Sequence, residues 1–148
     1  MPFAATGGIK SSTAMATLQL SVVAPDRTVF EDTVQSVILP GVEGYLGVQA
    51  NHEPLLVALR PGIIEFLDSS NQKSHVAVSG GFVEIGDNKV TVLAQDAQRA
   101  GEIDVAEQEA RLEEARRALR GESSSMTGEQ AQEEIERAMV RLRAARLS

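Results

Sequence analysis

Residues 89–112, KVTVLAQDAQRAGEIDVAEQEARL, contain the point at which the expected fold changes from strands to helices. The first six residues alternate as a β-strand does, with Val90 and Val92 on one face. After Gly101 the chain becomes rich in Ala, Glu and Arg. Asp104 stands where the N-cap of a helix is expected, and Glu107 follows at the spacing of a capping box. The stretch therefore predicts an α+β chain, with strands first and helices second.

The residues before this boundary have the pattern of short strands separated by turns. Apolar side chains alternate with polar ones at Leu18, Leu20 and Val22, as a half-buried strand requires. Turn formers such as Gly86-Asp87-Asn88 separate further β-rich runs. These runs cover residues 33–39, 62–67, 74–78, 82–85 and 89–93. The pattern predicts an N-terminal antiparallel β-sandwich, or a flattened barrel, over residues 16–101.

The residues after the boundary predict a C-terminal antiparallel two-helix hairpin over residues 102–148. Gly121 is placed to end the first helix, and Thr127 with Gln130 has the spacing of a capped start for the second. Each helix carries one apolar stripe. The first stripe is Val105, Leu112, Ala115 and Leu119, and the second is Ala131, Ile135, Ala138, Met139, Leu142 and Ala145.

Few of these stripe residues are large, which bears on the stability of the hairpin. Burial of a large aliphatic side chain is worth roughly 1.5–3 kcal/mol, and burial of alanine much less. Ordering the backbone costs roughly 1–2 kcal/mol per residue. We therefore expect the hairpin to be marginally stable alone and to dock on another surface. Weak docking also allows alternative docked positions of similar energy.

The composition excludes several classes of protein. Cysteine and tryptophan are absent and aromatic residues make up 3% of the chain, so we expect an aliphatic core without thiolate metal sites. The formal net charge of −7 argues against a nucleic-acid partner, which requires a basic face. No apolar run approaches the roughly 20 residues of a membrane-spanning helix, so direct membrane insertion is not expected.

The sequence shows no catalytic or metal-binding motif. His75 lies in an alternating strand and is interpreted as a sheet-surface residue, whereas His52 lies in a loop and suits a structural or interface role. Two histidines without cysteine do not make a zinc site. Neither a nucleophile elbow nor a phosphate-binding G-x-x-x-x-G-K-[ST] loop occurs. We expect a chain that is not an enzyme.

One segment is distinctive. Residues 44–56, GYLGVQANHEPLL, contain glycines that allow a tight loop, followed by a Pro-Leu-Leu return to the core. With Ser79-Gly80-Gly81-Phe82, the run VTVLA at residues 90–94, and the boundary at 99–104, the segment resembles the epsilon subunit of F-type ATP synthases. The resemblance runs in order from about Thr17 to Leu147.

The resemblance implies a non-catalytic subunit of the rotating central stalk, which joins the gamma subunit to the polar loops of the c-ring. Glu43 and Tyr45 would then face the c-ring, and His52 would lie near gamma. It also implies a hairpin that folds against the sandwich or extends into the catalytic head, where it blocks ATP hydrolysis. Acidic residues of the catalytic beta and alpha subunits would meet the basic end of the second helix, which carries Arg137, Arg141, Arg143 and Arg146.

Some bacterial members of this family bind ATP through a motif [IL]-D-x-x-R-A, from which this sequence departs. Asp104 matches the motif, and Arg137 and Arg141 match basic positions of the second helix. Glu107 stands in place of the motif arginine, and its negative charge repels phosphate. We predict weak ATP binding or none, and no other cofactor.

Two other functions fit the predicted fold. One is a stand-alone ligand-binding β-sandwich module with a helical adaptor, but such modules usually display aromatic platforms, and Tyr45 is the one tyrosine of the chain. The other is a coiled-coil adaptor, but each helix provides only two to three heptads.

Residues 1–15 are small and polar, and we interpret them as a leader outside the fold, either disordered or not native. They lack the apolar centre of a signal peptide and the Arg-rich character of a transit peptide. Together with the family resemblance, this favours a peripheral protein on the cytoplasmic face of the bacterial inner membrane.

Overall fold

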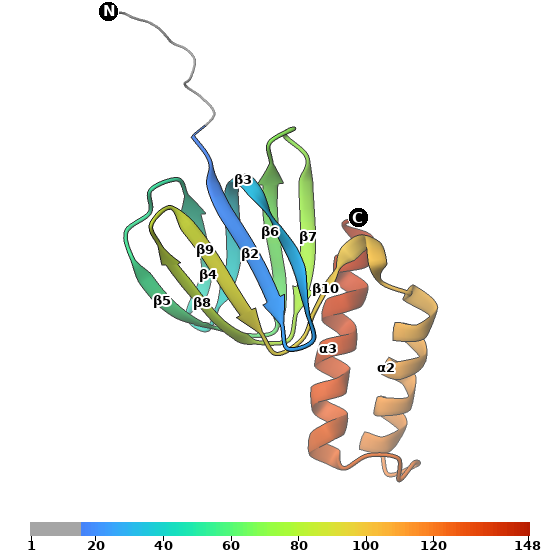
Figure 1. Cartoon of the computed structure of the whole chain (residues 1–148). Helices are drawn as coiled ribbons and strands as arrows, with labels where there is room; N and C mark the ends of the chain where they lie inside the picture. Colours follow the sequence, from blue (N-terminus) through green and yellow to red (C-terminus); the bar gives the residue numbers. More distant parts are fainter. Residues whose placement is uncertain (1–15) are drawn as a thin grey trace, which may run out of the picture.

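The structure, a computed structural model, describes residues 16–148; the leader expected at residues 1–15 lies outside the described residues. Strands come first and helices second (Figure 1). The strands are β2 (Leu18–Ala24), β3 (Arg27–Gly41), β4 (Gly44–Gln49), β5 (Leu55–Leu59), β6 (Gly62–Asp68), β7 (Lys73–Val78), β8 (Gly81–Gly86), β9 (Lys89–Ala94) and β10 (Ala97–Arg99). A short 3-10 helix, η2 (Ala100–Glu102), leads to helices α2 (Val105–Leu119) and α3 (Gly128–Arg146).

The long strand β3 joins the two layers of the sandwich. Its first half pairs with β2, and its second half pairs with β4 and β6. The hydrogen-bonded order is β10-β7-β6-β3-β2-β9-β8-β5. A contact between Gly41 and Leu59 links β5 back to β3 and closes a flattened barrel. The predicted fold class, a β-sandwich followed by two helices, is confirmed.

One pairing differs from the antiparallel prediction. β2 and β9 run parallel, with Leu20 opposite Val90 and Val22 opposite Val92. Turn signals determine the direction of strands that follow each other closely. β9 is far from β2 in sequence and takes its direction from the hairpin that it forms with β8.

The segment at residues 44–56 was expected to be a loop, and the structure corrects this. It forms all of β4, a turn, and the start of β5. Glycines weaken a strand through backbone entropy, so they favoured the loop interpretation. β4 tolerates Gly44 and Gly47 because β3 alone pairs with it in the part of the chain that the structure describes.

The sandwich core is aliphatic, as expected. Twenty buried residues form one cluster, and Leu20, Leu39 and Ile64 are its largest fully buried side chains. Gly81 explains how β8 and β9 approach so closely. Its φ of +135° is a glycine conformation, and a Cβ there would lie 2.1 Å from the carbonyl oxygen of Leu93.

The helix starts follow their predicted caps. The backbone N–H of Glu107 donates to Asp104 at 3.1 Å, and Thr127 with Gln130 forms a full capping box. The α2 cap is only half a box, because the carboxylate of Glu107 binds Arg111 instead. None of the helices within residues 16–148 is long and apolar enough to span a membrane.

The two helices bury fewer of their apolar residues than the predicted stripes contain. Val105, Leu119 and Met139 are exposed, whereas the buried apolar positions are mostly small: Ala115, Ala118, Ala131, Ala138, Val140 and Ala144. A helix offers more than one face, so an apolar stripe can lie partly outside the contact. α3 packs on α2 on one side and on β7, β6 and η2 on the other, so α3 stands between the sheet and α2 (Figure 1).

Candidate functional site

The contact between α3 and the sandwich is small and built from small side chains. Val140 and Ala144 of α3 pack on Ile63, Ala77 and Ala100. Ile103 packs at the edge of this cluster. We call this cluster the dock. Alanine permits a close approach of helix and sheet but contributes little burial energy per residue.

An ion pair between a buried arginine and a partly exposed aspartate lies beside the dock. Arg141 of α3 is 9% exposed, and its guanidinium donates to the carboxylate of Asp96, in the turn between β9 and β10. It also donates to Oε1 of Gln108 on α2 at 3.4 Å. A buried guanidinium requires such partners, because an unpaired buried charge is strongly destabilising. Asp96 and Gln108 had not been predicted as site residues, since neither belongs to a recognisable motif.

The three candidate nucleotide-site residues do not form one site. Asp104 caps α2, Arg137 binds Glu134 at 2.7 Å, and Arg141 is held by Asp96. Within residues 16–148, no hydrogen bond or ion pair joins Asp104 to either arginine. Glu107, at the departing position of the motif, binds Arg111 at 2.9 Å.

The end of α3 leaves two cations accessible. Arg143 and Arg146 are exposed in its last turn, and neither forms an ion pair with another described residue. Arg137 and Arg141, in contrast, are engaged by carboxylates of the chain itself. The four arginines predicted to act together therefore fall into an exposed pair and an occupied pair.

The predicted interface residues of the sandwich lie at its surface. Glu43 and Tyr45 are both exposed, Glu43 in the turn between β3 and β4 and Tyr45 at the start of β4. His52 follows β4 and is half-buried, with Nδ1 2.7 Å from the backbone carbonyl oxygen of Glu53. A shallow groove beside Glu43 and Tyr45 is lined by residues of β4 and β5, among them the exposed Leu55 and Leu56.

An apolar row on the sandwich had not been predicted. The strand registers place Ala58, Phe82, Leu93 and Val23 side by side across β5, β8, β9 and β2. Phe82 is 57% exposed and Leu93 56% exposed, because both point away from the core. We call these four residues the apolar row. The alternation in VTVLA, with Val90 and Val92 directed inward, already placed Leu93 on the outer face.

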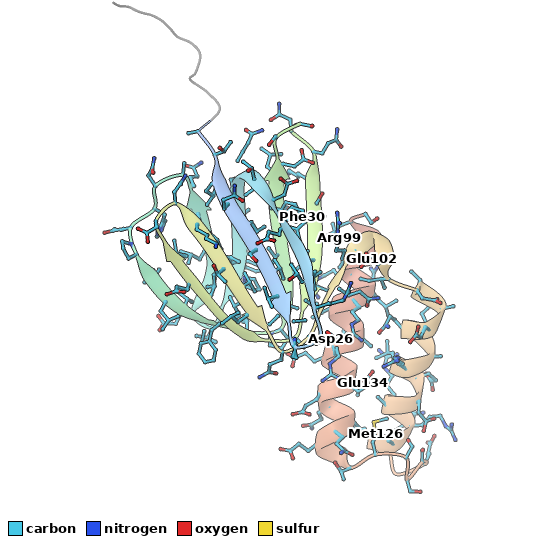
Figure 2. All side chains as sticks on the ribbon, in the orientation of Figure 1. Asp26, Phe30, Arg99, Glu102, Met126 and Glu134 are labelled. Atoms are coloured by element: carbon cyan, nitrogen blue, oxygen red, sulfur yellow. The ribbon has the colours of Figure 1, made fainter. Side chains whose placement is uncertain are left out.

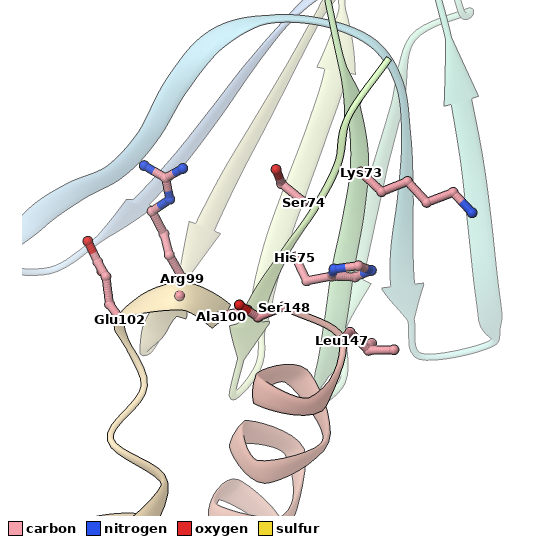
Figure 3. A pocket seen from close by; sticks show the side chains of 9 residues that line it. Lys73, Ser74, His75, Arg99, Ala100, Glu102, Leu147 and Ser148 are labelled. Atoms are coloured by element: carbon pink, nitrogen blue, oxygen red, sulfur yellow. The ribbon is translucent and has the colours of Figure 1, made fainter. Parts of the chain in front are cut away.

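His75 corrects the expectation of a sheet-surface residue. It points away from the sandwich core, as expected, but it is only 8% exposed because the end of α3 covers this face (Figure 3). Its Nε2 lies 3.0 Å from Oε1 of Glu65 on β6. Its Nδ1 is buried and has no hydrogen-bond partner among the described residues. Sequence alternation identified the face correctly but could not show which helix covers it.

The perturbed titratable groups lie at the far end of the hairpin. The hydroxyls of Ser123 and Ser125 donate to Glu114 and, with a smaller effect of Arg117, lower the pKa of its carboxyl. Glu122 and Arg120 pair beside them, which lowers the pKa of Glu122 and raises that of Arg120. All three groups are surface groups next to the turn between α2 and α3. Figure 2 labels Met126, which lies in this turn.

Comparison with known proteins defines the class of this fold. The family described as the beta-sandwich domain of the ATP synthase delta/epsilon chain matches residues 17–100. These residues include every strand of the described chain and the start of η2. The strand-rich part is therefore a sandwich domain of the ATP synthase delta/epsilon type.

Relatives over the whole length narrow the identification. The ATP synthase epsilon chain of Syntrophomonas wolfei is 38% identical over 132 residues, which cover 89% of this chain and 96% of the relative. That of Moorella thermoacetica is 40% identical over 131 residues, covering 88% and 98%. The chain belongs to the ATP synthase epsilon-chain family.

Solved structures agree with this assignment. A chain of the Euglena gracilis mitochondrial ATP synthase, in a structure of OSCP, F1 and the c-ring, matches with a TM-score of 0.69 and 27% identity, covering 95% of this chain and 90% of that one. A chain of the Tetrahymena thermophila central stalk and c-ring matches in fold, with a TM-score of 0.54 and 16% identity over 86% and 95%. The chain is thus a non-catalytic component of the ATP synthase central stalk, as the sequence indicated.

Proposed function

We propose that this chain joins the gamma subunit to the polar loops of the c-ring, and that its hairpin regulates ATP hydrolysis. The observation that carries the proposal is the unequal attachment of its two parts. The sandwich has a large aliphatic core, whereas the hairpin is attached through the dock and one partly buried ion pair. A platform for stable contacts and a helical element that can leave its docked position suit these two tasks.

The gamma subunit is assigned to the apolar row. Phe82 and Leu93 expose large apolar side chains next to each other, and Leu56 lies close by on β5. Contiguous exposed apolar surface is typical of protein interfaces, and aromatic residues often dominate their energetics. His52, which the family resemblance also places near gamma, lines a separate groove with Ile38 and Gly47 and is not part of the apolar row.

The c-ring loops are assigned to the turn between β3 and β4. Glu43 and Tyr45 present a carboxylate and a phenol group to solvent. Polar loops offer donors and acceptors that match both groups. This contact would be smaller and wetter than the apolar row, so it should contribute more to position than to affinity.

The catalytic beta and alpha subunits are assigned to the basic end of α3. Arg143 and Arg146 are free to meet an acidic surface in the docked state. Arg141 becomes available only when α3 leaves Asp96, whereas Arg137 is paired with Glu134 of the same helix in either position. Docking therefore masks Arg141, which supports inhibition by an extended hairpin.

We propose that ATP binds weakly or not at all. The support is that Asp104 caps a helix, Arg141 is occupied by Asp96, and Glu107 adds a negative charge. Isothermal titration of the chain with ATP tests this directly. A dissociation constant in the micromolar range or tighter would contradict it.

The proposed location is the cytoplasmic face of the bacterial inner membrane, with attachment through partner subunits. The support is that the relatives from Syntrophomonas wolfei and Moorella thermoacetica are bacterial. Release of the chain from membranes together with the catalytic head, under conditions that leave integral proteins in place, is the expected result of fractionation.

The main test is ATP hydrolysis by a matching catalytic head with gamma, stripped of this chain. The full chain should lower the rate, and the chain ending at Gly101 should bind gamma without lowering it. The double variant Arg143→Glu/Arg146→Glu should lose inhibition but keep binding to gamma. Arg116→Glu, an exposed arginine on α2, is the matched control and should inhibit normally. If full and shortened chains bind gamma and leave the rate equal, the regulatory part of the proposal is wrong.

A further inference from the structure

A single arginine joins three elements of the folded chain. Arg141 of α3 donates from Nη2 to the carboxylate of Asp96 on the sandwich, and from Nη1 to Oε1 of Gln108 on α2 at 3.4 Å. Gln108 is only 3% exposed, so the amide and the guanidinium are both buried. Because α3 packs on β7, β6 and η2 while α2 packs on α3, this guanidinium links α2 to the sandwich (Figure 1).

Without support, an ion pair of this kind contributes little to docking. The side chain of Asp96 is 42% exposed, and water competes for such a carboxylate. The arginine side chain also loses much rotamer freedom when it is held in one geometry. A second group that already holds the guanidinium in place would remove part of this entropic cost.

Gln108 has the position and the chemistry to hold the guanidinium. The guanidinium group is planar, and its donors have fixed relative directions. When Nη1 of Arg141 is bound to Gln108, Nη2 is directed toward Asp96. The contact with Gln108 is buried, and a hydrogen bond from a charged donor is stronger in such surroundings than in water.

We propose that Gln108 is a positioning residue, which holds Arg141 on Asp96 so that packing of α2 on α3 strengthens docking of α3 on the sandwich. Separation of the two helices then weakens docking, although α2 packs on α3 rather than on the sandwich. By linkage, docking strengthens the packing of α2 by the same factor. The consequence for hydrolysis rests on the proposed function: a partner that displaces α2 would also free Arg141 for an acidic surface.

The test is a double-mutant cycle on docking in the isolated chain. Energy transfer between dyes on Ser70→Cys and Ser124→Cys, two exposed positions in a chain without cysteine, measures the docked fraction. Gln108→Met keeps the side-chain length but removes the acceptor, so the docking equilibrium constant should fall about three- to tenfold. In the Arg141→Met background the same change should have an effect of less than about twofold. An unchanged constant in the parent background, or an equal fall in both backgrounds, overturns the proposal.

Two further measurements separate positioning from packing. Gln132→Met, the same change at an exposed glutamine of α3, should leave docking unchanged, and a fall equal to that of Gln108→Met would contradict the proposal. Asp96→Ala, which alters neither helix, should speed hydrogen exchange of the α2 amides about three- to tenfold, and Arg141→Met should abolish this effect. This measurement decides the question if Gln108→Met does not fold: exchange of α2 that is indifferent to Asp96, or that depends on it equally in Arg141→Met, overturns the coupling. Neither measurement involves gamma or the catalytic head, so failure of the regulatory proposal would leave both results unaffected.

Discussion

The sandwich and the hairpin are stabilised by different kinds of contact, although they belong to one chain of 148 residues. In the sandwich, leucine, isoleucine and valine side chains from both layers interlock in one cluster. In the hairpin and its dock, alanines allow close backbone approach, and a single buried arginine fixes the position. A given substitution should therefore cost much more in the first region than in the second, and each prediction below tests this contrast.

Glycine replacement should show the largest difference. Gly81→Ala forces a side chain into a glycine conformation and against the carbonyl oxygen of Leu93, so it should cost about 3–6 kcal/mol. Gly121 also has a positive φ, of +80°, but a Cβ there meets open space, so Gly121→Ala should cost about 1 kcal/mol. Urea unfolding of both variants measures the two values. Equal costs would show that strain in the two regions is absorbed equally well.

Leucine truncation compares the cores themselves. Leu20 is fully buried in the sandwich, and Leu20→Ala should cost about 2–5 kcal/mol in urea unfolding. Leu142 of α3 is half-buried, and Leu142→Ala should cost about 1 kcal/mol because water already reaches part of its surface. If Leu142→Ala is as costly as Leu20→Ala, the hairpin is not the weaker region.

The ion pair between Arg141 and Asp96 should affect docking without affecting the sandwich. Asp96→Ala leaves a buried guanidinium with one long contact to Gln108, and docking should weaken by about 1–3 kcal/mol, less than for a fully buried pair because Asp96 is partly exposed. Arg141→Met replaces the cation by an apolar side chain and should change docking by less than about 1 kcal/mol. Energy transfer between dyes on Ser70→Cys and Ser124→Cys, two exposed positions in a chain without cysteine, reports docking. The urea midpoint of the sandwich should stay constant in both variants.

Local sequence patterns accounted for most elements of the fold. Alternation located β2, β6, β7, β8 and β9, and the caps at Asp104 and Thr127 located both helices, because these signals arise within one element. Contacts between elements distant in sequence were not predictable in this way. The parallel pairing of β2 with β9 and the pairing of Asp96 with Arg141, 45 residues apart, depend on how finished elements pack.

The same distinction applies to the candidate sites. The family resemblance implied that Glu43 and Tyr45 are exposed, and both are, Glu43 in the turn after β3 and Tyr45 in β4. His75 was assigned to the correct face of its strand, yet its burial depends on α3, which comes about 60 residues later in the sequence. The apolar row was present in the alternation of β8 and β9, but a neighbouring strand had to be identified before Phe82 and Leu93 could be recognised as adjacent.

The turn between the helices should show the smallest effect and a characteristic pH dependence. Hydroxyls of Ser123 and Ser125, at 2.6 Å and 2.5 Å from Oε2, lower the pKa of Glu114 below its ordinary value of 4.5. A carboxyl whose pKa is lowered by folding stabilises the folded state above its unfolded pKa, and this contribution is lost as the pH falls through the lowered value. Glu114→Gln should therefore melt slightly below the parent chain at neutral pH and converge with it in acid, as followed by circular dichroism of the helices.

The control is Glu109→Gln, which changes an exposed carboxylate of the same helix. It should show no such convergence, because folding gives Glu109 no hydrogen-bond partner among the described residues. A constant difference between Glu114→Gln and the parent at all pH values would mean that the serine hydroxyls do not act through the charge of Glu114, and the turn would then rest on packing alone, like the dock.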